Sequence, residues 1–172
     1  DFWNGGDGGV TDPLTGILSL TNVGVVAIGT NGGAPLRDHL INLEKEVAVD
    51  NADIGEMAYV TTPGVRAKLK LTKTDTGSGL FVWDGTELNG YRAFTTTQIP
   101  SNLTKGSGTG LHAIVFGVFS TAILAQFGGY DLVLDDKTQA LKATLRVVAN
   151  SWWDTAFRND EAFAVVKDAD IT

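Results

Sequence analysis

The amino-acid sequence predicts an α+β fold, and two contrasting patterns of hydrophobic residues carry that prediction. Leu36, Leu40, Leu43 and Val47 recur at spacings of four, three and four, which places them on one side of an α-helix. Over residues 141–149, apolar residues instead alternate with polar ones, which is typical of a β-strand. The predicted helices and strands follow no regular strand–helix repeat, which favours α+β over a parallel α/β fold.

The first third of the chain is predicted to form a loop, a strand and a helix. Residues 1–16 are rich in glycine and turn-forming residues and are expected to be a loop. A short apolar run at residues 23–28 predicts a strand. The amphipathic helix is expected to start at Pro35 and to reach about Asp50.

A second, shorter helix is predicted directly after a buried strand at residues 57–60. Thr62 has the side chain of a helix N-cap, and Pro63 suits the first turn because it needs no backbone N–H. The helix is expected to reach Leu71, with its basic residues facing water; these are Arg66, Lys68 and Lys70.

The middle of the chain is predicted to be mostly extended. Residues 72–79 form a hairpin or surface loop before a strand at residues 80–83, which ends in a turn. Residues 91–99 are expected to be extended, and residues 101–110 to form a flexible loop.

The last third of the chain is predicted to be rich in strands. The continuous apolar run at residues 113–119 predicts a strand covered on both faces. Ser120 is expected to cap a short helical turn, and Gly128-Gly129 to break the chain before a strand at residues 130–134. A strand at residues 162–166 closes the chain.

Composition excludes several functional classes. Hydrophobic residues make up 43% and charged residues 19% of 172 residues, which predicts a folded chain with a real core. The absence of cysteine excludes disulfides, thiolate zinc sites and thiol nucleophiles. The net charge of −7 argues against tight binding of nucleic-acid phosphates.

No feature of the sequence predicts membrane insertion or secretion. No apolar run approaches the ~20 residues that cross a bilayer, and the chain begins with Asp1 in place of a signal segment. We therefore expect a soluble, non-secreted protein. Asp1 itself is compatible with a processing point, an expression boundary or the start of a fragment.

Neither histidine lies in a catalytic motif. His39 falls on the first predicted helix, where a solvated or packing role is expected, and His112 lies beside a buried strand. An enzyme, such as a small hydrolase, would need a serine within reach of His112. The candidates are Ser101, Ser107 and Ser120.

Two further patterns resemble ligand sites but are interpreted as structural. The glycines at residues 106–110 lead into a predicted strand and not into a helix, so they form a flexible loop and not a phosphate cradle. Carboxylates cluster at residues 131–136 and at Asp168 and Asp170, but without the spacing of a calcium loop. The sequence therefore predicts no cofactor and no metal site.

Trp152 and Trp153 are the candidate subunit-interface residues. They follow the alternating strand directly, and consecutive strand residues face opposite sides, so both cannot enter one core layer. At least one is expected to contact a second lobe of the same chain or a neighbouring subunit.

Five short segments, spread over nearly the whole chain, carry a family resemblance. They are residues 7–18, with DG and PLTGIL; residues 57–63, MAYVTTP, before a short basic helix; residues 88–100, with LNGYRA and QIP; residues 114–132, with IVFG and GGYDL; and residues 153–166, with WD and AFAVV. Their order and spacing resemble the major capsid proteins of tailed bacteriophages, the family with the Hong Kong 97 type shell fold that encapsulins share.

The resemblance implies a domain organisation. Residues 20–135 and 156–172 would form the axial domain, which clusters around capsomer axes, with a mixed β-sheet and flanking helices. Residues 1–19 and 136–155 would belong to the peripheral domain, with a long antiparallel strand. The family's amino-terminal arm, extended loop and most of its spine helix have no counterpart, so the chain resembles a fragment. Some relatives join their subunits through a Lys–Asn isopeptide bond, but the loop that carries the lysine has no counterpart here, so this cross-link is not expected.

The resemblance also implies a structural function. The full-length protein would assemble with itself into hexamers and pentamers of an icosahedral shell around genomic DNA. Scaffold, portal or decoration proteins would be further partners, and the location would be the virion, with the host cytoplasm during assembly. Alone, this chain is predicted to be monomeric or to form small oligomers. An encapsulin-like compartment subunit is the alternative, followed by an enzyme, namely a small hydrolase or a capsid-maturation protease.

Overall fold

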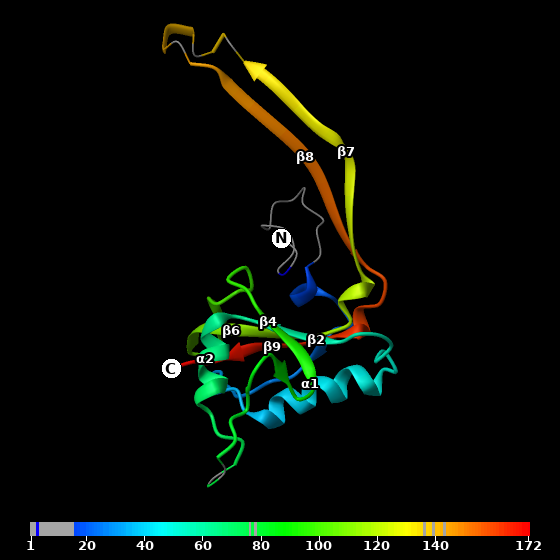
Figure 1. Ribbon diagram of the computed structural model, residues 1–172, viewed down its shortest axis with the longest axis vertical. Coiled ribbons are helices and arrows are strands. Elements are labelled where there is room, and N and C mark those ends of the chain that lie inside the picture. Colours follow the sequence, from blue (N-terminus) through cyan, green and yellow to red (C-terminus); the bar gives the residue numbers. More distant parts are fainter. Residues whose placement is uncertain are drawn as a thin grey trace.

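The chain folds into a compact lobe of mixed sheet and helices, from which a long two-stranded ribbon projects (Figure 1). This computed structural model describes residues 3, 16–75, 77, 79–135, 137–138, 140–142 and 144–172. The α+β prediction is confirmed, and so is the expected arrangement of a mixed lobe beside a long antiparallel strand. The expected loop at residues 1–16 lies almost wholly outside the described residues.

The sheet of the lobe has seven strands of mixed direction. Its order is β1-β9-β6-β2-β4-β3, and β5 pairs with β6 beside this path. β1 runs parallel to β9 and β2 runs parallel to β4, whereas the other pairs are antiparallel. The strands are β1 (Gly24–Val25), β2 (Ala58–Thr61), β3 (Glu87–Leu88), β4 (Tyr91–Thr95), β5 (Leu103–Lys105), β6 (Gly108–Gly117) and β9 (Phe163–Ala169).

Two helices pack against this sheet where the sequence predicts them. Helix α1 (Arg37–Val49) buries Leu40, Leu43 and Val47, and helix α2 (Pro63–Leu71) begins at the predicted cap. The Thr62 hydroxyl accepts a hydrogen bond from the Val65 backbone N–H at 3.4 Å, which satisfies one of the free donors of the first turn. Within the described part of the chain, no helix is long and apolar enough to cross a membrane.

The core is centred on aromatic side chains of β2 and β6. The rings of Tyr59 and Phe116 lie 4.4 Å apart between centroids, and Tyr91 meets Phe116 edge to face at 5.2 Å. The Tyr59 hydroxyl donates to the Glu44 carboxylate, with the Leu40 carbonyl oxygen 3.0 Å away. Burial, together with the Glu44 carboxylate, raises the pKa of Tyr59 far above its ordinary value.

The prediction of a flexible loop at residues 101–110 is wrong, because most of these residues form β5, a turn and the start of β6. Leu103 pairs with Leu111 and Lys105 with Gly108 around a tight turn. A β-carbon on Gly108 would lie 1.9 Å from the Asn31 carbonyl oxygen, so glycine here permits close backbone packing and does not indicate mobility.

Four other predictions of local structure need correction. The alternating segment does not begin as a strand: residues 140–142 form a 3-10 turn, and β8 starts only at Arg146. Val118, and not Ser120, precedes the 3-10 turn Phe119–Thr121. Gly128-Gly129 lie within β7, in an irregularity of the pairing. Pairing with β8 carries β7 past these two glycines. Residues 80–83 form no strand, and only Phe81 among them makes an isolated bridge, with Lys73.

Candidate assembly surface

The ribbon consists of β7 (Ala122–Asp135) and β8 (Arg146–Phe157), which pair with each other and with no other strand of the described residues. The register runs from Ala122 opposite Phe157 to Asp135 opposite Arg146, with one shift between Phe127 and Asp131. Fourteen residues of β7, at about 3.3 Å each, extend roughly 45 Å. The ribbon is therefore a projecting arm with two faces.

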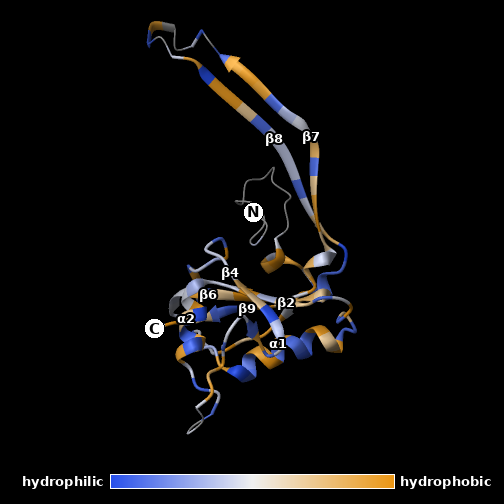
Figure 2. Cartoon of the chain, viewed as in Figure 1, coloured by the Kyte–Doolittle hydropathy of each residue, from blue (hydrophilic) through white to orange (hydrophobic). Residues whose placement is uncertain are grey.

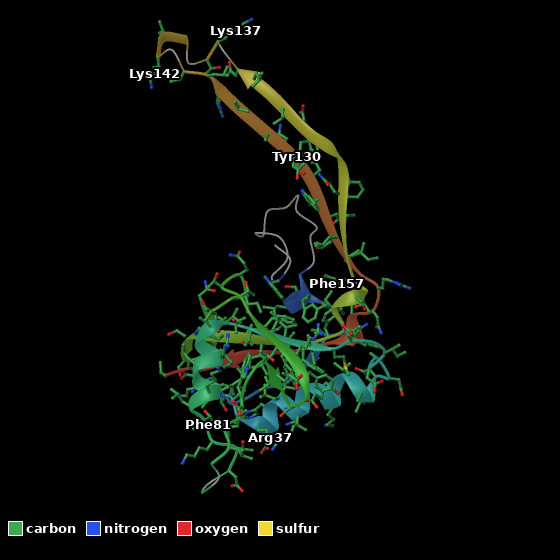
Figure 3. All side chains as sticks on the ribbon, in the orientation of Figure 1. Arg37, Phe81, Tyr130, Lys137, Lys142 and Phe157 are labelled. Atoms are coloured by element: carbon green, nitrogen blue, oxygen red, sulfur yellow. The ribbon has the colours of Figure 1, made fainter. Side chains whose placement is uncertain are left out.

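The base of the ribbon is packed firmly on the lobe. Phe163 meets Phe119 and Phe157 edge to face, with ring centroids 5.6 and 5.7 Å apart. The Arg158 N–H donates to the Thr121 carbonyl oxygen at 3.1 Å. Figure 3 shows Phe157 at this base and Lys137 and Lys142 at the far end of the arm. These contacts fix the direction in which the ribbon leaves the lobe.

One face of the ribbon carries no charge, and we call it the uncharged face. Residues directly opposite each other in an antiparallel pair lie on the same face, so the register assigns each pair. The pairs of the uncharged face are Ala122 with Phe157, Leu124 with Thr155, Gln126 with Trp153, Leu132 with Ala149, and Leu134 with Val147. Leu124, Leu132, Leu134, Val147 and Trp153 are all more than half exposed.

The opposite face mixes apolar and charged residues. Its pairs are Ile123 with Ala156, Ala125 with Asp154, Phe127 with Trp152, Asp131 with Asn150, Val133 with Val148, and Asp135 with Arg146. Figure 2 shows hydrophobic segments along both strands, interrupted by hydrophilic ones. Since the charges lie on one face only, the two faces suit different surroundings.

The structure places Trp152 and Trp153 inside β8, and not after the end of a strand as the sequence pattern indicated. Trp152 lies opposite Phe127 and is 57% exposed, and Trp153 lies opposite Gln126 on the uncharged face and is 52% exposed. Neither belongs to the core of the lobe. Their role as interface residues remains a prediction.

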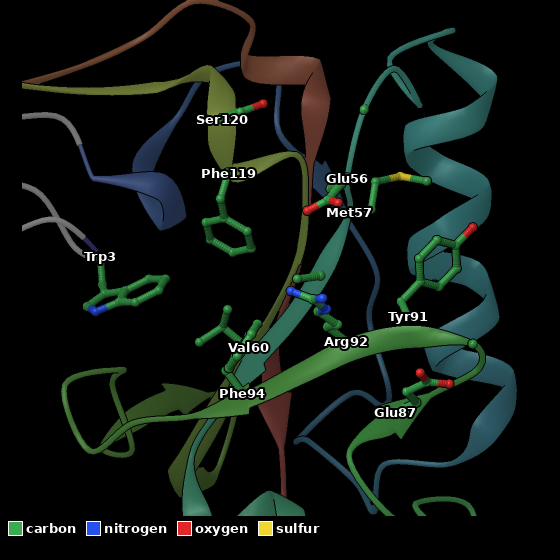
Figure 4. Close-up of a pocket in the computed structure, with 13 residues that line it drawn as sticks. Trp3, Glu56, Met57, Val60, Glu87, Tyr91, Arg92, Phe94, Phe119 and Ser120 are labelled. Atoms are coloured by element: carbon green, nitrogen blue, oxygen red, sulfur yellow. The ribbon is translucent and has the colours of Figure 1, made fainter.

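A hollow of about 760 Å³ lies near the base of the ribbon. Figure 4 shows Trp3, Phe119 and Val60 around it, with Tyr91 and Arg92 farther along. Ser120 also lines the hollow, but His112 does not. The hollow therefore does not bring together the serine and histidine that a hydrolase would need.

The two histidines have structural partners. Nδ1 of His39 accepts a hydrogen bond from the Leu36 N–H at 3.1 Å, which caps the start of α1. Nδ1 of His112 lies 2.8 Å from the Thr62 hydroxyl. Within the described residues, no hydrogen bond joins His112 to Ser101, Ser107 or Ser120, so the geometry supports no nucleophile–base pair.

His112 makes stability depend on pH. Burial lowers the pKa of His112 below its ordinary value, although the Asp170 carboxylate acts in the opposite direction. An unfolded histidine binds its proton near pH ~6.5, whereas the folded chain resists protonation of His112. The folded state therefore keeps its full stability above that pH and loses part of it as the pH falls through the lower folded pKa. We expect urea unfolding to show a larger loss of stability between pH 7.5 and 5.5 for the wild type than for His112→Gln. Equal losses in both proteins would contradict this.

The glycine-rich segment at residues 106–110 and the carboxylates of Asp135 and Asp168 make contacts within the chain. Lys105 Nζ lies 2.6 Å from the Asp168 carboxylate, and the Ser107 N–H donates to the Asn31 side chain at 3.2 Å. Asp135 accepts hydrogen bonds from the N–H groups of Lys137 and Thr138, and hydrogen bonding by Thr138 lowers the pKa of Asp135. Asp136 lies outside the described residues.

Comparison with known proteins identifies the family. The model of the phage capsid family matches residues 1–168. The chain belongs to the phage capsid family. A major capsid protein of Halomonas phage phiHAP-1 is 28% identical over 130 residues, which cover 76% of this chain and 20% of that protein. The resemblance found in the sequence is thereby confirmed.

Solved structures of capsid-type shells have the same fold as this family member. The capsid of a native GTA particle has a TM-score of 0.69 at 18% identity, over 98% of this chain and 65% of that chain. The SrpI encapsulin of Synechococcus elongatus PCC 7942 has a TM-score of 0.61 at 19% identity, over 92% of this chain and 57% of that chain. The chain thus spans less than two thirds of these relatives.

Proposed function

We propose that this chain is the wall-building part of a phage or prophage capsid subunit, whose role is to assemble with copies of itself. Membership of the phage capsid family supports this role. The structural observation that carries it is the exposed, uncharged face of the ribbon. The role requires no catalytic residues and no cofactor.

Physical chemistry explains why this face needs a partner. A two-stranded ribbon alone is at best marginally stable in water, and large contiguous apolar patches on a protein surface commonly mark interaction sites. Burying the exposed side chains of the uncharged face would contribute roughly 25 cal/mol for each Å² removed from water. Shell subunits meet this need through many copies of a modest contact.

In the terms of the family, we assign the lobe to the axial domain and the ribbon to the peripheral domain. The sequence grouped residues 20–135 with the axial domain, and that boundary stays a prediction. The pairing of β7 with β8 supports extending the peripheral part back to Ala122.

The proposed surroundings of the subunit follow from the same role. Hexamers and pentamers of the longer gene product would enclose the genome, with scaffold, portal or decoration proteins as further partners in the host cytoplasm and the virion. The net charge of −7 favours a wall that does not hold packaged DNA tightly.

One structural neighbour supports a second candidate, a subunit of an encapsulin-like compartment. The fold similarity to the Synechococcus encapsulin extends over 92% of this chain. Both candidates form closed shells, so the cargo separates them: packaged nucleic acid supports the capsid, and packaged protein supports the compartment.

Electron microscopy of the full-length gene product tests the proposal. Expression of that product alone, or with the neighbouring genes for other particle components, is expected to give closed icosahedral shells. Purified product that stays monomeric under both conditions would contradict the proposed function.

Trp153→Ala is expected to weaken assembly without unfolding the lobe. Trp153 is the largest side chain of the uncharged face, and a buried tryptophan at an interface is worth about 2 kcal/mol per contact. The yield of closed shells, measured by sedimentation, should fall at least tenfold. Gln126→Ala, directly opposite on the same face, is the matched control, and its yield of closed shells should fall far less. Equal yields for the wild type and Trp153→Ala would show that this tryptophan lies outside any interface.

A further inference from the structure

The two ends of the lobe carry exposed apolar side chains surrounded by opposite charges. At the first, which we call the acidic end, Val49 and Ile54 are 65% and 79% exposed. Exposed carboxylates surround them at the end of α1 and in the following loop; these are Asp50, Asp53 and Glu56. This end therefore combines an apolar contact with negative charge.

The second surface, which we call the basic end, follows helix α2. Leu71, Leu80 and Phe81 are 77%, 69% and 45% exposed. Leu71 lies beside the exposed Lys70 in the sequence, and the exposed Lys73 makes an isolated bridge with Phe81. The Thr74 N–H donates to the Leu80 carbonyl oxygen, and the Val82 N–H to that of Thr72, both at 2.9 Å. These bonds hold residues 72–74 beside residues 80–82, close to the end of α2.

The acidic charge at the end of α1 is locally unfavourable, which suggests that it serves another contact. A helix C-terminus carries partial negative charge and is stabilised by cations by about 0.3 to 1 kcal/mol. Helix α1 has no basic residue in its last turn and has Asp50 as its C-cap, whereas α2 has Lys68 and Lys70 in its last turn. Lys45 and Glu46 form an ion pair at 3.7 Å, so the three exposed carboxylates dominate this end.

The two ends cannot meet within one molecule. Figure 1 shows the end of α1 and helix α2 on opposite sides of the lobe, with β2 running between them. Helix α1 has 13 residues, which at 1.5 Å each span roughly 20 Å. Complementary surfaces on opposite sides of one body favour head-to-tail contact between copies.

We propose that the acidic end of one copy docks on the basic end of the next, as a head-to-tail contact between lobes in a ring. The inference rests on the proposed function and specifies the surfaces through which lobes meet. Val49 and Ile54 would pack against Leu71, Leu80 and Phe81, while Lys70 and Lys73 face the carboxylates. The charges set the orientation of the contact more than its strength.

Isotope-mixing cross-linking tests the contact directly. Equal amounts of ¹⁴N- and ¹⁵N-labelled chain are mixed at high concentration in 50 mM salt and treated with a zero-length carbodiimide cross-linker. Mass spectrometry should find mixed-isotope links that join Lys70 or Lys73 to the tryptic peptide of residues 46–66. The links should fade at 500 mM salt, because exposed charges are then screened within roughly 5 Å.

Charge-reversed variants provide the matched controls. Lys70→Glu with Lys73→Glu, and separately Asp53→Lys with Glu56→Lys, should each weaken self-association at least fivefold in sedimentation equilibrium. A mixture of these two variants should restore it, because opposite charges then face each other at both contacts. The pair Lys137→Glu with Lys142→Glu makes the same charge change at the far end of the ribbon and should have no effect.

The outcomes separate this inference from the proposed function. Mixed-isotope links confined to other peptides, absence of self-association, or no recovery in the mixture would overturn the head-to-tail contact. Shell formation by the full-length product would still support the capsid role in each of those cases.

Discussion

Phe163→Ala is expected to reduce the free energy of unfolding by about 3 to 5 kcal/mol, the usual cost of truncating a buried phenylalanine. Phe163 has no exposed surface and meets Phe119 and Phe157 edge to face. These three rings join β9 to the base of the ribbon, so removal of the central Phe163 ring should loosen the ribbon as well as the core. Urea unfolding followed by circular dichroism measures the first effect.

Phe94→Ala is the matched control for this variant. Phe94 lies in β4 but is 53% exposed, and surface substitutions usually change stability by about 0.5 kcal/mol or less. Hydrogen exchange of the β7 and β8 amides should rise in Phe163→Ala and not in Phe94→Ala. A loss below about 1 kcal/mol for Phe163→Ala would contradict the packing described here.

Asp168→Ala is expected to cost about 3 to 5 kcal/mol, because it removes a buried carboxylate that accepts two backbone hydrogen bonds and pairs with a partly exposed lysine. Asp168 is 2% exposed and accepts hydrogen bonds from the N–H groups of Ile28 and Gly29, at 3.0 and 3.2 Å. Its carboxylate also lies 2.6 Å from Lys105 Nζ. Removal would leave two backbone donors and an ammonium group without their acceptor.

Two controls separate charge from size at this position. Asp168→Asn keeps the shape and an acceptor oxygen, so it should cost less, about 1 to 3 kcal/mol. Asp131→Ala removes an exposed carboxylate of the ribbon and should cost about 0.5 kcal/mol or less. If Asp168→Ala and Asp131→Ala unfold at the same urea concentration, the Asp168 contacts contribute nothing to stability.

Local patterns in the sequence were sufficient where short-range physics decides the structure. The spacing of Leu36, Leu40, Leu43 and Val47 predicted α1, although Leu36 is its N-cap and is 46% exposed. The Thr62-Pro63 pair predicted the start of α2. Both features depend on residues within one or two helical turns. The family resemblance depended on the joint order of several short motifs, and no single motif carried it.

Long-range pairing explains the features that the sequence did not reveal. Leu103–Lys105 has no strand signature of its own and becomes β5 only because β6 lies beside it. The uncharged face is visible only once the register places Gln126 opposite Trp153 and Leu132 opposite Ala149. The sequence indicated the tryptophans as candidates, but not the surface to which Trp153 belongs.

Hydroxyl-radical footprinting of assembled shells tests most directly whether the uncharged face is an assembly surface. Oxidation of Trp153, Leu124 and Leu132 is compared between shells of the full-length gene product and this chain alone, with the exposed Tyr130 as internal reference. We predict that assembly protects these three residues at least fivefold relative to Tyr130. Unchanged oxidation of all three in closed shells would contradict the account.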